Sequence, residues 1–330
     1  MKQYLTRLLQ NDTLTQEETC QIMHNITENK YEDAQVASLI TCIQMRGISP
    51  EELLGFRQGL LETGKYMDFS EYNTIDIVGT GGDGKNTFNI STCASFVVAG
   101  AGYKVTKHGN GASSSVSGAS NVLTAHNVKF TDDISVLKHS LDEAGICYFH
   151  APLFAYGMKN VGPVRRSLAV PTFFNLLGPL VNPCHPKNSL HGAANHQQLR
   201  LYNDVHRLIG DNYGVLTSYD GYDEISLTSD FKICTNQEET VYSPQDLGFA
   251  VVKQEEIRGG DTAEDAVRVF DAVLKGTSTE AQKNVVIANA AAAISVMEKK
   301  SLVDCLEIAK ESLESGKALK SFTKFVEING

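Results

Sequence analysis

The segment Thr74-Ile-Asp-Ile-Val-Gly-Thr-Gly-Gly-Asp-Gly-Lys-Asn-Thr-Phe-Asn-Ile-Ser-Thr92 contains the strongest structural signal of this chain. It begins with alternating β-forming residues, continues through four glycines within six residues, and ends in hydroxyl and amide side chains. An apolar run at 96–101 and a strand-like piece at 104–106 follow, which gives the order strand, glycine loop, helix, strand. This order predicts a βαβ unit with the glycine loop at the carboxyl end of its first strand.

The glycine loop predicts an anion-binding site. Open parallel sheets bind ligands at this end of their strands, and glycines let backbone N–H groups approach an anion at the start of a helix. The spacing fits neither a P-loop nor a dinucleotide fingerprint, and Asp83 lies within the loop itself. Backbone donors beside one carboxylate suit a ligand with both phosphates and hydroxyls, such as a ribose phosphate. A glycine-rich turn without a ligand is the alternative.

Composition places the chain among ordinary globular proteins. Its 330 residues are 42% hydrophobic and 21% charged, which allows one large domain or two smaller ones. The sequence has neither an apolar run long enough to cross a bilayer nor an N-terminal signal pattern, so we expect no membrane partner. The net charge of −10 argues against nucleic acid as a partner, and any anionic substrate needs a local positive site.

The seven cysteines are scattered along the chain and none forms a C-x-x-C pair. The sequence therefore gives no sign of a zinc motif or a redox pair, and single thiols of this kind predict a reduced, cytoplasmic protein.

The N-terminal part predicts a small helical domain at 1–70. Thr15-Gln-Glu-Glu18 has the form of a capping box, and Ser49-Pro50-Glu51-Glu52 combines an N-cap, a first-turn proline and a reaching glutamate. We expect this domain to support a homodimer and to be completed by a helix near 164–180. An α/β domain at 71–330 would bind substrate and metal.

The second part of the chain alternates strands and helices and contains three further candidate sites. The loop at 109–118 has several glycines and four serines, which makes it a second candidate anion cradle. Arg165 and Arg166 precede Gly178-Pro179, where we expect their helix to end, and form either a solvated face or a basic site. Asp223 and Glu224 follow the predicted strand 213–217 and suit Mg²⁺, although an acidic turn is the alternative.

Six motifs together resemble one family over nearly the whole chain. They are Gly79-Thr-Gly-Gly-Asp83, Asn89-Ile-Ser-Thr92, Lys107-His-Gly-Asn110, Val164-Arg-Arg166, Phe174-Asn-Leu-Leu-Gly-Pro-Leu-Val-Asn-Pro183 and Gly221-Tyr-Asp-Glu-Ile-Ser226. In this order and at this spacing they closely resemble the anthranilate phosphoribosyltransferases of tryptophan biosynthesis. The resemblance implies an α/β fold like that of the nucleoside phosphorylases, with a small helical domain, a mostly parallel central sheet and a homodimeric assembly.

The same resemblance implies an activity and a set of site residues. The activity is transfer of phosphoribose from phosphoribosyl pyrophosphate (PRPP) to the anthranilate amine, with release of pyrophosphate. Two Mg²⁺ ions would be bound, one by Ser91 with Glu224 and one by Asp223 with Glu224. The residues implied for PRPP are Gly79, Gly82, Asp83, Thr87, Asn89, Ile90, Ser91, Thr92, Lys107, Ser115 and Ala119. Those implied for anthranilate are Gly79, Asn110 and Arg165.

Elementary chemistry agrees with this assignment and names three catalytic candidates. Lys107 and Mg²⁺ would neutralise the negative charge that develops on pyrophosphate. Arg165 would hold the anthranilate carboxylate with two parallel hydrogen bonds and so fix the neighbouring amine. The aromatic amine is already neutral at pH 7, so no strong general base is required. His108 either takes the late proton or orders the loop.

The chain departs from the family pattern on the acceptor side. Gly111 follows Lys107-His-Gly-Asn110 where the family has arginine, Ala155-Tyr156 replaces His-Pro, Pro171 replaces arginine, and Ala119-Ser-Asn121 replaces Ser-Ala-Asp. A different amine acceptor is therefore one alternative. A pyrimidine nucleoside phosphorylase would not need Asp223 and Glu224, and a non-catalytic nucleic-acid-binding relative would need a basic groove.

Overall fold

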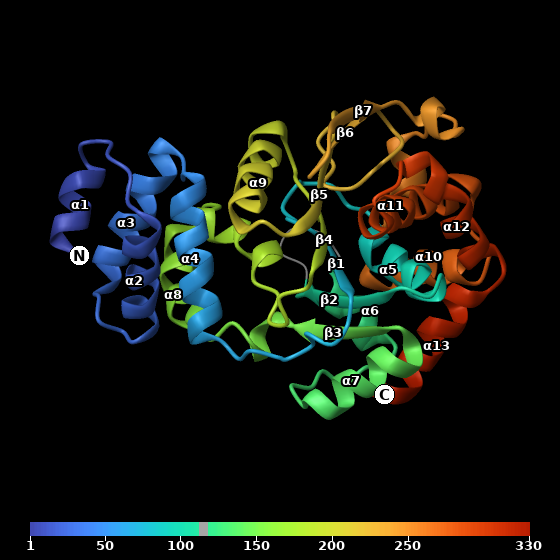
Figure 1. Ribbon diagram of the computed structural model, residues 1–330, viewed down its shortest axis with the longest axis horizontal. Coiled ribbons are helices and arrows are strands. Elements are labelled where there is room, and N and C mark those ends of the chain that lie inside the picture. Colours follow the sequence, from blue (N-terminus) through green and yellow to red (C-terminus); the bar gives the residue numbers. More distant parts are fainter. Residues whose placement is uncertain (112–117) are drawn as a thin grey trace. The chain divides into compact units, whose positions relative to one another are not determined.

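The computed structural model describes residues 1–111 and 118–330, which fall into two compact units (Figure 1). Unit 1 comprises Met1–Asp68 and Ala151–His185, and unit 2 comprises Phe69–His150 and Pro186–Gly330.

Unit 1 is helical, as its capping signals predict. Its helices are α1 (Lys2–Leu8), α2 (Gln16–Thr27), α3 (Asp33–Arg46), α4 (Pro50–Thr63) and α8 (Gly157–Leu168). Both predicted capping boxes are confirmed: the hydroxyls of Thr15 and Ser49 accept from the backbone N–H of Glu18 and Glu52, whose carboxylates accept from the two cap N–H groups. Each box satisfies donors that a helix start otherwise leaves unpaired.

The prediction that the helix after Arg165 ends at Gly178 is wrong. α8 ends at Leu168, because Ala169 adopts the left-handed conformation with φ 54° and Pro171 follows two residues later. Residues 173–176 and 178–180 form short 3-10 turns instead. Arg165 and Arg166 therefore lie in the last turn of α8.

A buried glutamate connects three segments of unit 1. Glu52 has a fully buried side chain, and its carboxylate accepts from the backbone N–H of Leu14 and Ser49, each at 2.9 Å. The Nη2 of Arg46 donates to both of its oxygens, at 2.6 and 2.8 Å. All these donors depend on one carboxylate, so its removal would leave a partly buried cation and a buried amide without this partner.

We expect Glu52→Ala to lower the free energy of unfolding by about 3–5 kcal/mol, the cost of breaking a buried ion pair from one side. Urea unfolding followed by circular dichroism measures this loss. Glu51→Ala, at the exposed neighbouring position, is the matched control and should change the value by less than about 1 kcal/mol. Equal effects of the two substitutions would show that the Glu52 network does not stabilise the unit.

Unit 2 is built on one sheet with the strand order β3-β2-β1-β4-β5-β6-β7. β1 to β5 are parallel, as predicted, whereas β6 and β7 add to one edge in antiparallel fashion. The strands are β1 (Thr74–Gly79), β2 (Lys104–Gly109), β3 (Ile146–His150), β4 (Asn188–Gly192), β5 (Asn212–Ser218), β6 (Phe231–Thr235) and β7 (Glu239–Tyr242). The predicted βαβ unit is confirmed as β1, α5 (Ile90–Gly100) and β2.

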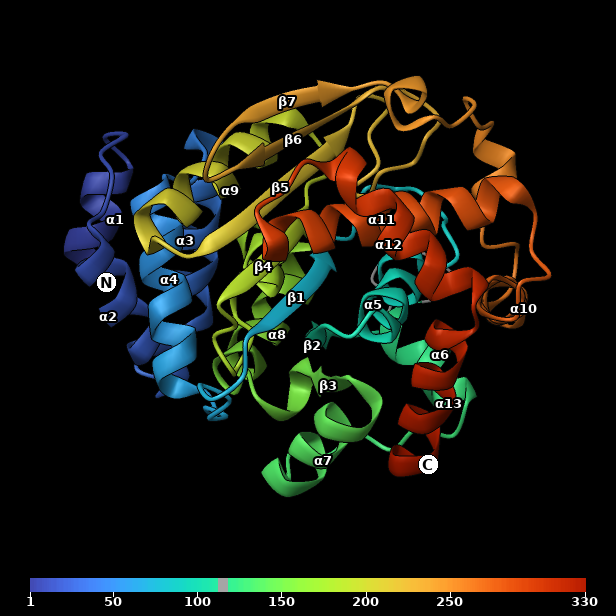
Figure 2. The ribbon, with the colours of Figure 1, turned by 45° about the vertical axis from the view of Figure 1, so that its right-hand side comes forward.

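Helices cover both faces of this sheet (Figures 1 and 2). The alanine-rich α11 (Glu280–Glu298) packs with α5 on one face, and α9 (His196–Ile209) lies on the other. α11 is buried from Val285 to Val296, because small side chains allow it to approach both α5 and the strands. The remaining helices of the described part of unit 2 are α6 (Ala119–Ala125), α7 (Ile134–Ala144), α10 (Ala263–Leu274), α12 (Leu302–Glu314) and α13 (Lys317–Asn329).

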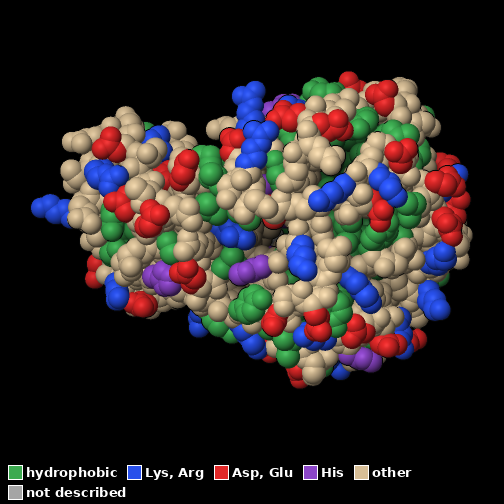
Figure 3. Space-filling view, in the orientation of Figure 1, with side chains coloured by type: hydrophobic (Ala, Val, Ile, Leu, Met, Phe, Trp, Pro, Cys, Tyr) green, Lys and Arg blue, Asp and Glu red, His purple; other side chains and the backbone are tan. Residues whose placement is uncertain are grey.

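Two surface properties bear on possible partners. Among the described residues, every helix is too short or too polar to cross a membrane. A nucleic-acid groove would gather basic side chains along one face, whereas acidic and basic side chains are interspersed on the face shown in Figure 3.

Candidate active site

The glycine loop continues directly from β1 at the carboxyl edge of the sheet. Gly81, Gly82 and Gly84 have φ values of 63°, 73° and 73°. Residues other than glycine rarely adopt this left-handed backbone conformation. Asp83 closes the loop, since its Oδ1 accepts from the backbone N–H of Lys85 at 2.9 Å. The glycines of the motif are thus required by the path of the chain.

The loop leads into the first turn of α5, where the backbone N–H of Ser91 donates to the carboxylate of Glu224. Asn89 precedes the helix with φ 64° and provides no side-chain cap for its N–H groups. The buried hydroxyl of Thr92, in the first turn, has no hydrogen-bond partner among the described residues. A helix N-terminus favours an anion, and here the carboxylate of Glu224 takes that position beside the Thr92 hydroxyl.

Asp223 reaches this loop across the end of a neighbouring strand. The loop after β5 passes over β4, where Gly192 pairs in register with Gly79 of β1. A Cβ on Gly192 would lie 1.6 Å from the carbonyl oxygen of Asp223, and one on Gly79 would lie 2.3 Å from its Oδ2. That carboxylate oxygen accepts from the backbone N–H of Gly81 at 2.7 Å. Two glycines on paired strands therefore make room for the acidic loop.

Glu224 lies beside Asp223 and contacts the start of α5. Its Oε1 accepts from the backbone N–H of Ser91 at 2.8 Å, and its Oε2 accepts from the hydroxyl of Thr87 at 3.2 Å. The structure thus brings together four predicted site residues: Thr87, Ser91, Asp223 and Glu224.

Two buried polar residues hold the acidic loop in place. Asn289 of α11 binds the backbone of Ile225 from both sides, accepting from its N–H at 3.0 Å and donating to its carbonyl at 2.8 Å. The hydroxyl of Ser218 donates to the carbonyl oxygen of Glu224 at 2.7 Å. Because both anchors come from regular elements, the position of the carboxylates is fixed by the fold.

Burial of the carboxylates of Asp223 and Glu224 side by side is electrostatically unfavourable. Both residues are 8% exposed. Burial raises the pKa of Asp223 well above its usual value, and the nearby Asp83 and Glu224 raise it further. Burial also raises the pKa of Glu224 to about 7, against the N–H of Ser91, which lowers it. A bound cation would relieve the repulsion between these buried like charges.

The residues present fit a hydrated divalent cation. Asp223 and Glu224 supply hard oxygen ligands, and Mg²⁺ prefers one or two carboxylates with phosphate oxygens and waters completing its coordination. Ser91 contacts Glu224 through its backbone N–H, and its role as a metal ligand stays a prediction.

Lys107 supplies the buried positive charge that an anionic ligand requires. It lies in β2, is 2% exposed, and donates from Nζ to the carbonyl oxygen of Ile77. Burial lowers its pKa to about 8, although Asp76 and Glu224 act in the opposite direction. The neighbouring His108 is also buried, and its backbone N–H donates to Oδ1 of Asp76 at 3.0 Å.

The other predicted residues of unit 2 lie near the same strand ends. Ile90 begins α5, Asn110 follows β2, and the Asn110 carbonyl accepts from the N–H of Ser120 in α6 at 3.2 Å. Ala119 is the first residue of α6. Ser115 lies outside the described residues.

Arg165 belongs to unit 1 and is positioned there by an asparagine. Its half-exposed guanidinium donates from Nη2 to Oδ1 of Asn175 at 3.0 Å, and the same oxygen accepts from the N–H of Thr172 at 3.2 Å. Partial burial lowers the pKa of Arg165. Ala155 and Pro171, two of the departures from the family pattern, also lie in unit 1.

The sequence reasoning missed Gly192 and Asn289. A glycine at the end of a buried strand, in His191-Gly192-Ala193, is a weak signal by itself. Asn289 was the better signal, because it is the one amide within the apolar run 285–294 of a predicted buried helix. A lone amide in such a run needs a specific partner.

We expect Gly192→Ala to lower the free energy of unfolding by at least about 2 kcal/mol, because the added methyl overlaps backbone of the acidic loop and the loop must move. Thermal unfolding without ligands measures the loss. At Gly178 a Cβ would meet nothing within 4 Å, so Gly178→Ala is the control and should change stability by less than about 1 kcal/mol. A wild-type unfolding temperature for Gly192→Ala would contradict the packing described above.

Comparisons with known proteins cover the whole chain. Residues 2–64 match the family model described as the glycosyl transferase family, helical bundle domain, and residues 71–319 match the a/b domain of that family. The anthranilate phosphoribosyltransferase of Phocaeicola vulgatus is 55% identical over 330 residues, which is 100% of both chains.

Two solved structures share the fold. Anthranilate phosphoribosyltransferase from Thermus thermophilus superposes with a TM-score of 0.92 at 28% identity, covering 98% of both chains. The Saccharomyces cerevisiae anthranilate phosphoribosyltransferase in complex with PRPP and Mg gives a TM-score of 0.91 at 25% identity, covering 99% of this chain and 96% of that one.

Proposed function

The chain belongs to the anthranilate phosphoribosyltransferase family, and we propose that it transfers phosphoribose to anthranilate in a Mg²⁺-dependent reaction at the carboxyl edge of its sheet. One observation carries the metal-dependent part of this proposal. Asp223 and Glu224 are buried together against the glycine loop and the first turn of α5. This arrangement offers a divalent cation and a phosphorylated ligand adjacent positions.

The reaction exchanges one bond at the ribose C1 for another. The bond from C1 to the pyrophosphate oxygen breaks, its electron pair leaves with pyrophosphate, and the amine nitrogen forms a new bond to C1 before losing a proton to solvent. Bound Mg²⁺ would neutralise charge on the leaving pyrophosphate, and Asp223, Glu224 and Ser91 are the residues that would hold it. We place one or two ions here, since the carboxylate pair can serve both.

The chain's own groups stabilise the donor. The glycine loop and the positive end of α5 favour phosphate oxygens next to Asp223 and Glu224, and Thr92 offers its buried hydroxyl there. Lys107 provides a charge that is already desolvated, so it acts strongly on the negative charge that develops in the transition state.

The acceptor is held by its carboxylate. Arg165 is oriented by Asn175, and a guanidinium held in this way can donate two parallel hydrogen bonds to a carboxylate. Anthranilate carries its amine next to that carboxylate, so alignment of the acid also aligns the nucleophile. The homodimer predicted for the helical domain stays a prediction, which sedimentation velocity checks.

We expect Arg165→Ala to raise the KM for anthranilate by about 10- to 100-fold, the loss of a charge-assisted hydrogen-bonded contact, and to change the KM for PRPP by less than about threefold. Steady-state kinetics with each substrate varied in turn measure both constants. Arg166→Ala, at the exposed adjacent position, is the control. Equal increases in the two KM values would show that Arg165 does not bind the acceptor specifically.

The reaction itself is tested by identifying its products. Incubation of the purified protein with PRPP, anthranilate and Mg²⁺ should give phosphoribosyl anthranilate and pyrophosphate in equal amounts, as measured by mass spectrometry and a coupled pyrophosphate assay. Pyrophosphate formed in the absence of anthranilate, or with a different aromatic amine only, would assign another acceptor.

A further inference from the structure

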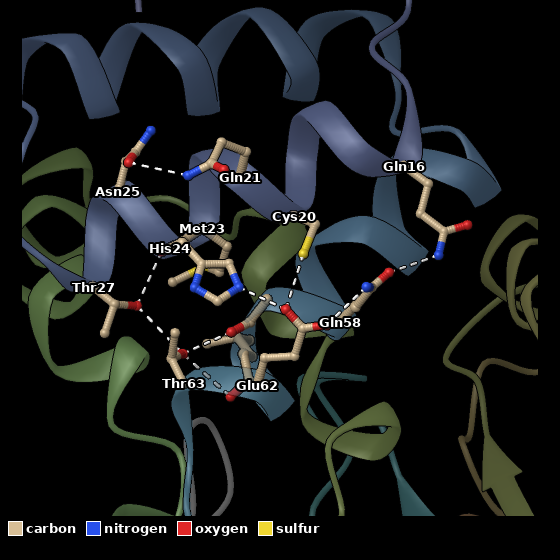
Figure 4. Close-up of polar contacts among 12 residues, drawn as sticks. Gln16, Cys20, Gln21, Met23, His24, Asn25, Thr27, Gln58, Glu62 and Thr63 are labelled. Atoms are coloured by element: carbon tan, nitrogen blue, oxygen red, sulfur yellow. Dashed lines mark hydrogen bonds and ion pairs between the residues drawn. The ribbon is translucent and has the colours of Figure 1, made fainter.

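Three potential metal ligands that the candidate active site does not include meet on the helices of unit 1. Cys20 and His24 lie one turn apart on α2, and Glu62 faces them from α4 (Figure 4). Oε2 of Glu62 lies 2.7 Å from Nε2 of His24 and 3.5 Å from Sγ of Cys20. One ligand atom from each residue lies within 4.8 Å of the other two.

Close packing of α2 and α4 creates this cluster. A Cβ on Gly55 would lie 1.9 Å from Oγ1 of Thr19, and one on Gly59 would lie 2.6 Å from Cβ of Met23. Both glycines therefore bring the backbone of α4 against α2. Glu62 follows Gly59 by three residues, on the same helix face, and its short side chain reaches the thiol and the imidazole only because the helices are this close.

A chain of amides orients the carboxylate. Nε2 of Gln58 donates to Oε1 of Glu62 at 2.8 Å, and Nε2 of Gln16 donates to Oε1 of Gln58 at 2.8 Å. The oxygen that faces Cys20 and His24 is thus the one that Gln58 leaves free. Groups that fix one oxygen of a ligating carboxylate in this way are typical supports of metal sites.

We propose that Cys20, His24 and Glu62 bind one zinc-class divalent ion with a fourth position open to solvent. A thiolate, an imidazole and a carboxylate form a mixed soft and hard set that suits Zn²⁺ and Co²⁺ and does not suit Mg²⁺. The thiol is buried, whereas the side chains of His24 and Glu62 are 30% and 47% exposed, so an ion can enter from solvent and keep a water ligand.

Metal binding replaces hydrogen bonds that exist in the metal-free protein. Burial and the Glu62 carboxylate raise the pKa of the Cys20 thiol to about 11, and its proton lies toward Glu62. Binding releases this proton to solvent and replaces the contact between His24 and Glu62 by two metal bonds. The ion joins α2 to α4 and stabilises the helical unit, a role independent of phosphoribosyl transfer.

Titration of the full-length, metal-free protein with Co²⁺ tests the proposal directly. We expect one equivalent to produce thiolate-to-cobalt charge-transfer absorption, and one equivalent of Zn²⁺ to abolish it. Cys20→Ser should lose the absorption, while Cys42→Ser, which removes a partly exposed thiol on α3, should keep it. Glu224→Gln should also keep the absorption, because Glu224 is not a ligand of the proposed site.

Further measurements guard against misfolding of the Cys20 variant. His24→Asn should weaken Co²⁺ binding by at least about tenfold while the far-ultraviolet circular dichroism stays unchanged. Zn²⁺ should raise the unfolding temperature of the wild type and not that of His24→Asn. Absence of charge-transfer absorption in the wild type, or its persistence in Cys20→Ser, would overturn the proposal and leave His24 and Glu62 as a surface ion pair.

Discussion

Glu224→Gln is expected to reduce kcat for phosphoribosyl transfer by about 10²- to 10³-fold, which is the usual effect of removing one group that stabilises charge in a transition state. The amide oxygen can still accept from the N–H of Ser91, so the start of α5 stays in place. The charge that attracts the cation is lost. Because the buried carboxylate itself is unfavourable, the variant should unfold at no lower temperature than the wild type.

Steady-state rates at several Mg²⁺ concentrations measure this effect together with any change in metal requirement. Glu238→Gln makes the same chemical change at an exposed position of unit 2 and should leave the rate unchanged. A Glu224→Gln enzyme that keeps more than about a tenth of the wild-type rate, with the same Mg²⁺ dependence, would show that this carboxylate does not bind the metal.

Lys107→Met is expected to lower the activity of the protein and to raise its stability. Methionine fills a similar volume without the charge, so turnover should fall at least about 100-fold through loss of stabilisation at the leaving group. Burial lowers the pKa of Lys107 from 10.5 to about 8, so the folded wild type at pH 7 holds an unfavourable buried charge. The variant should therefore be more stable at pH 7, by up to roughly 3 kcal/mol.

The gain in stability from Lys107→Met should depend on pH in a defined way. Below about pH 8 the lysine is charged in both the folded and the unfolded chain, and the full penalty is present. Between pH 8 and 10.5 the unfolded chain binds more protons, so wild-type stability rises relative to the variant and the difference disappears. Urea unfolding at pH 7 and pH 10 measures both values. A gain that is constant with pH, or retained activity, would contradict the role assigned to this charge.

Local signals in the sequence predicted the strand, the glycine loop and the helix start of the candidate site well. The sequence Thr74–Thr92 encodes strand, loop and helix start through short-range patterns, since β-forming residues alternate in the strand and the positive φ values of the loop favour glycine. The capping boxes at Thr15 and Ser49 are equally local and are confirmed. The family resemblance added the activity, which these patterns alone do not specify.

Features that depend on strand order were not predictable from one sequence. Gly79, Gly192 and Asp223 are far apart in the chain and meet only because β4 lies between β1 and β5. The end of α8 was misplaced because Ala169, which has no special preference for positive φ, adopts the left-handed conformation there. The antiparallel β6 and β7 carry no signal that distinguishes them from parallel strands.

The cluster on α2 and α4 shows the same limitation. His24 and Glu62 are 38 positions apart, and their contact follows from the close approach of two helices at Gly55 and Gly59. Spacing rules for zinc motifs look for pairs of cysteines or histidines close in sequence, so a site that takes its third ligand from a facing helix escapes them.

The dependence of transfer on a divalent cation is the claim that links the buried carboxylates to the activity. The fluorescence of anthranilate, followed after addition of PRPP with Mg²⁺ or with excess chelator, tests it in one experiment. We expect anthranilate to be consumed with Mg²⁺ present and to remain unchanged after chelation. Consumption at the same rate in chelator, or no consumption with Mg²⁺ and PRPP present, would contradict the metal-dependent transfer proposed for Asp223 and Glu224.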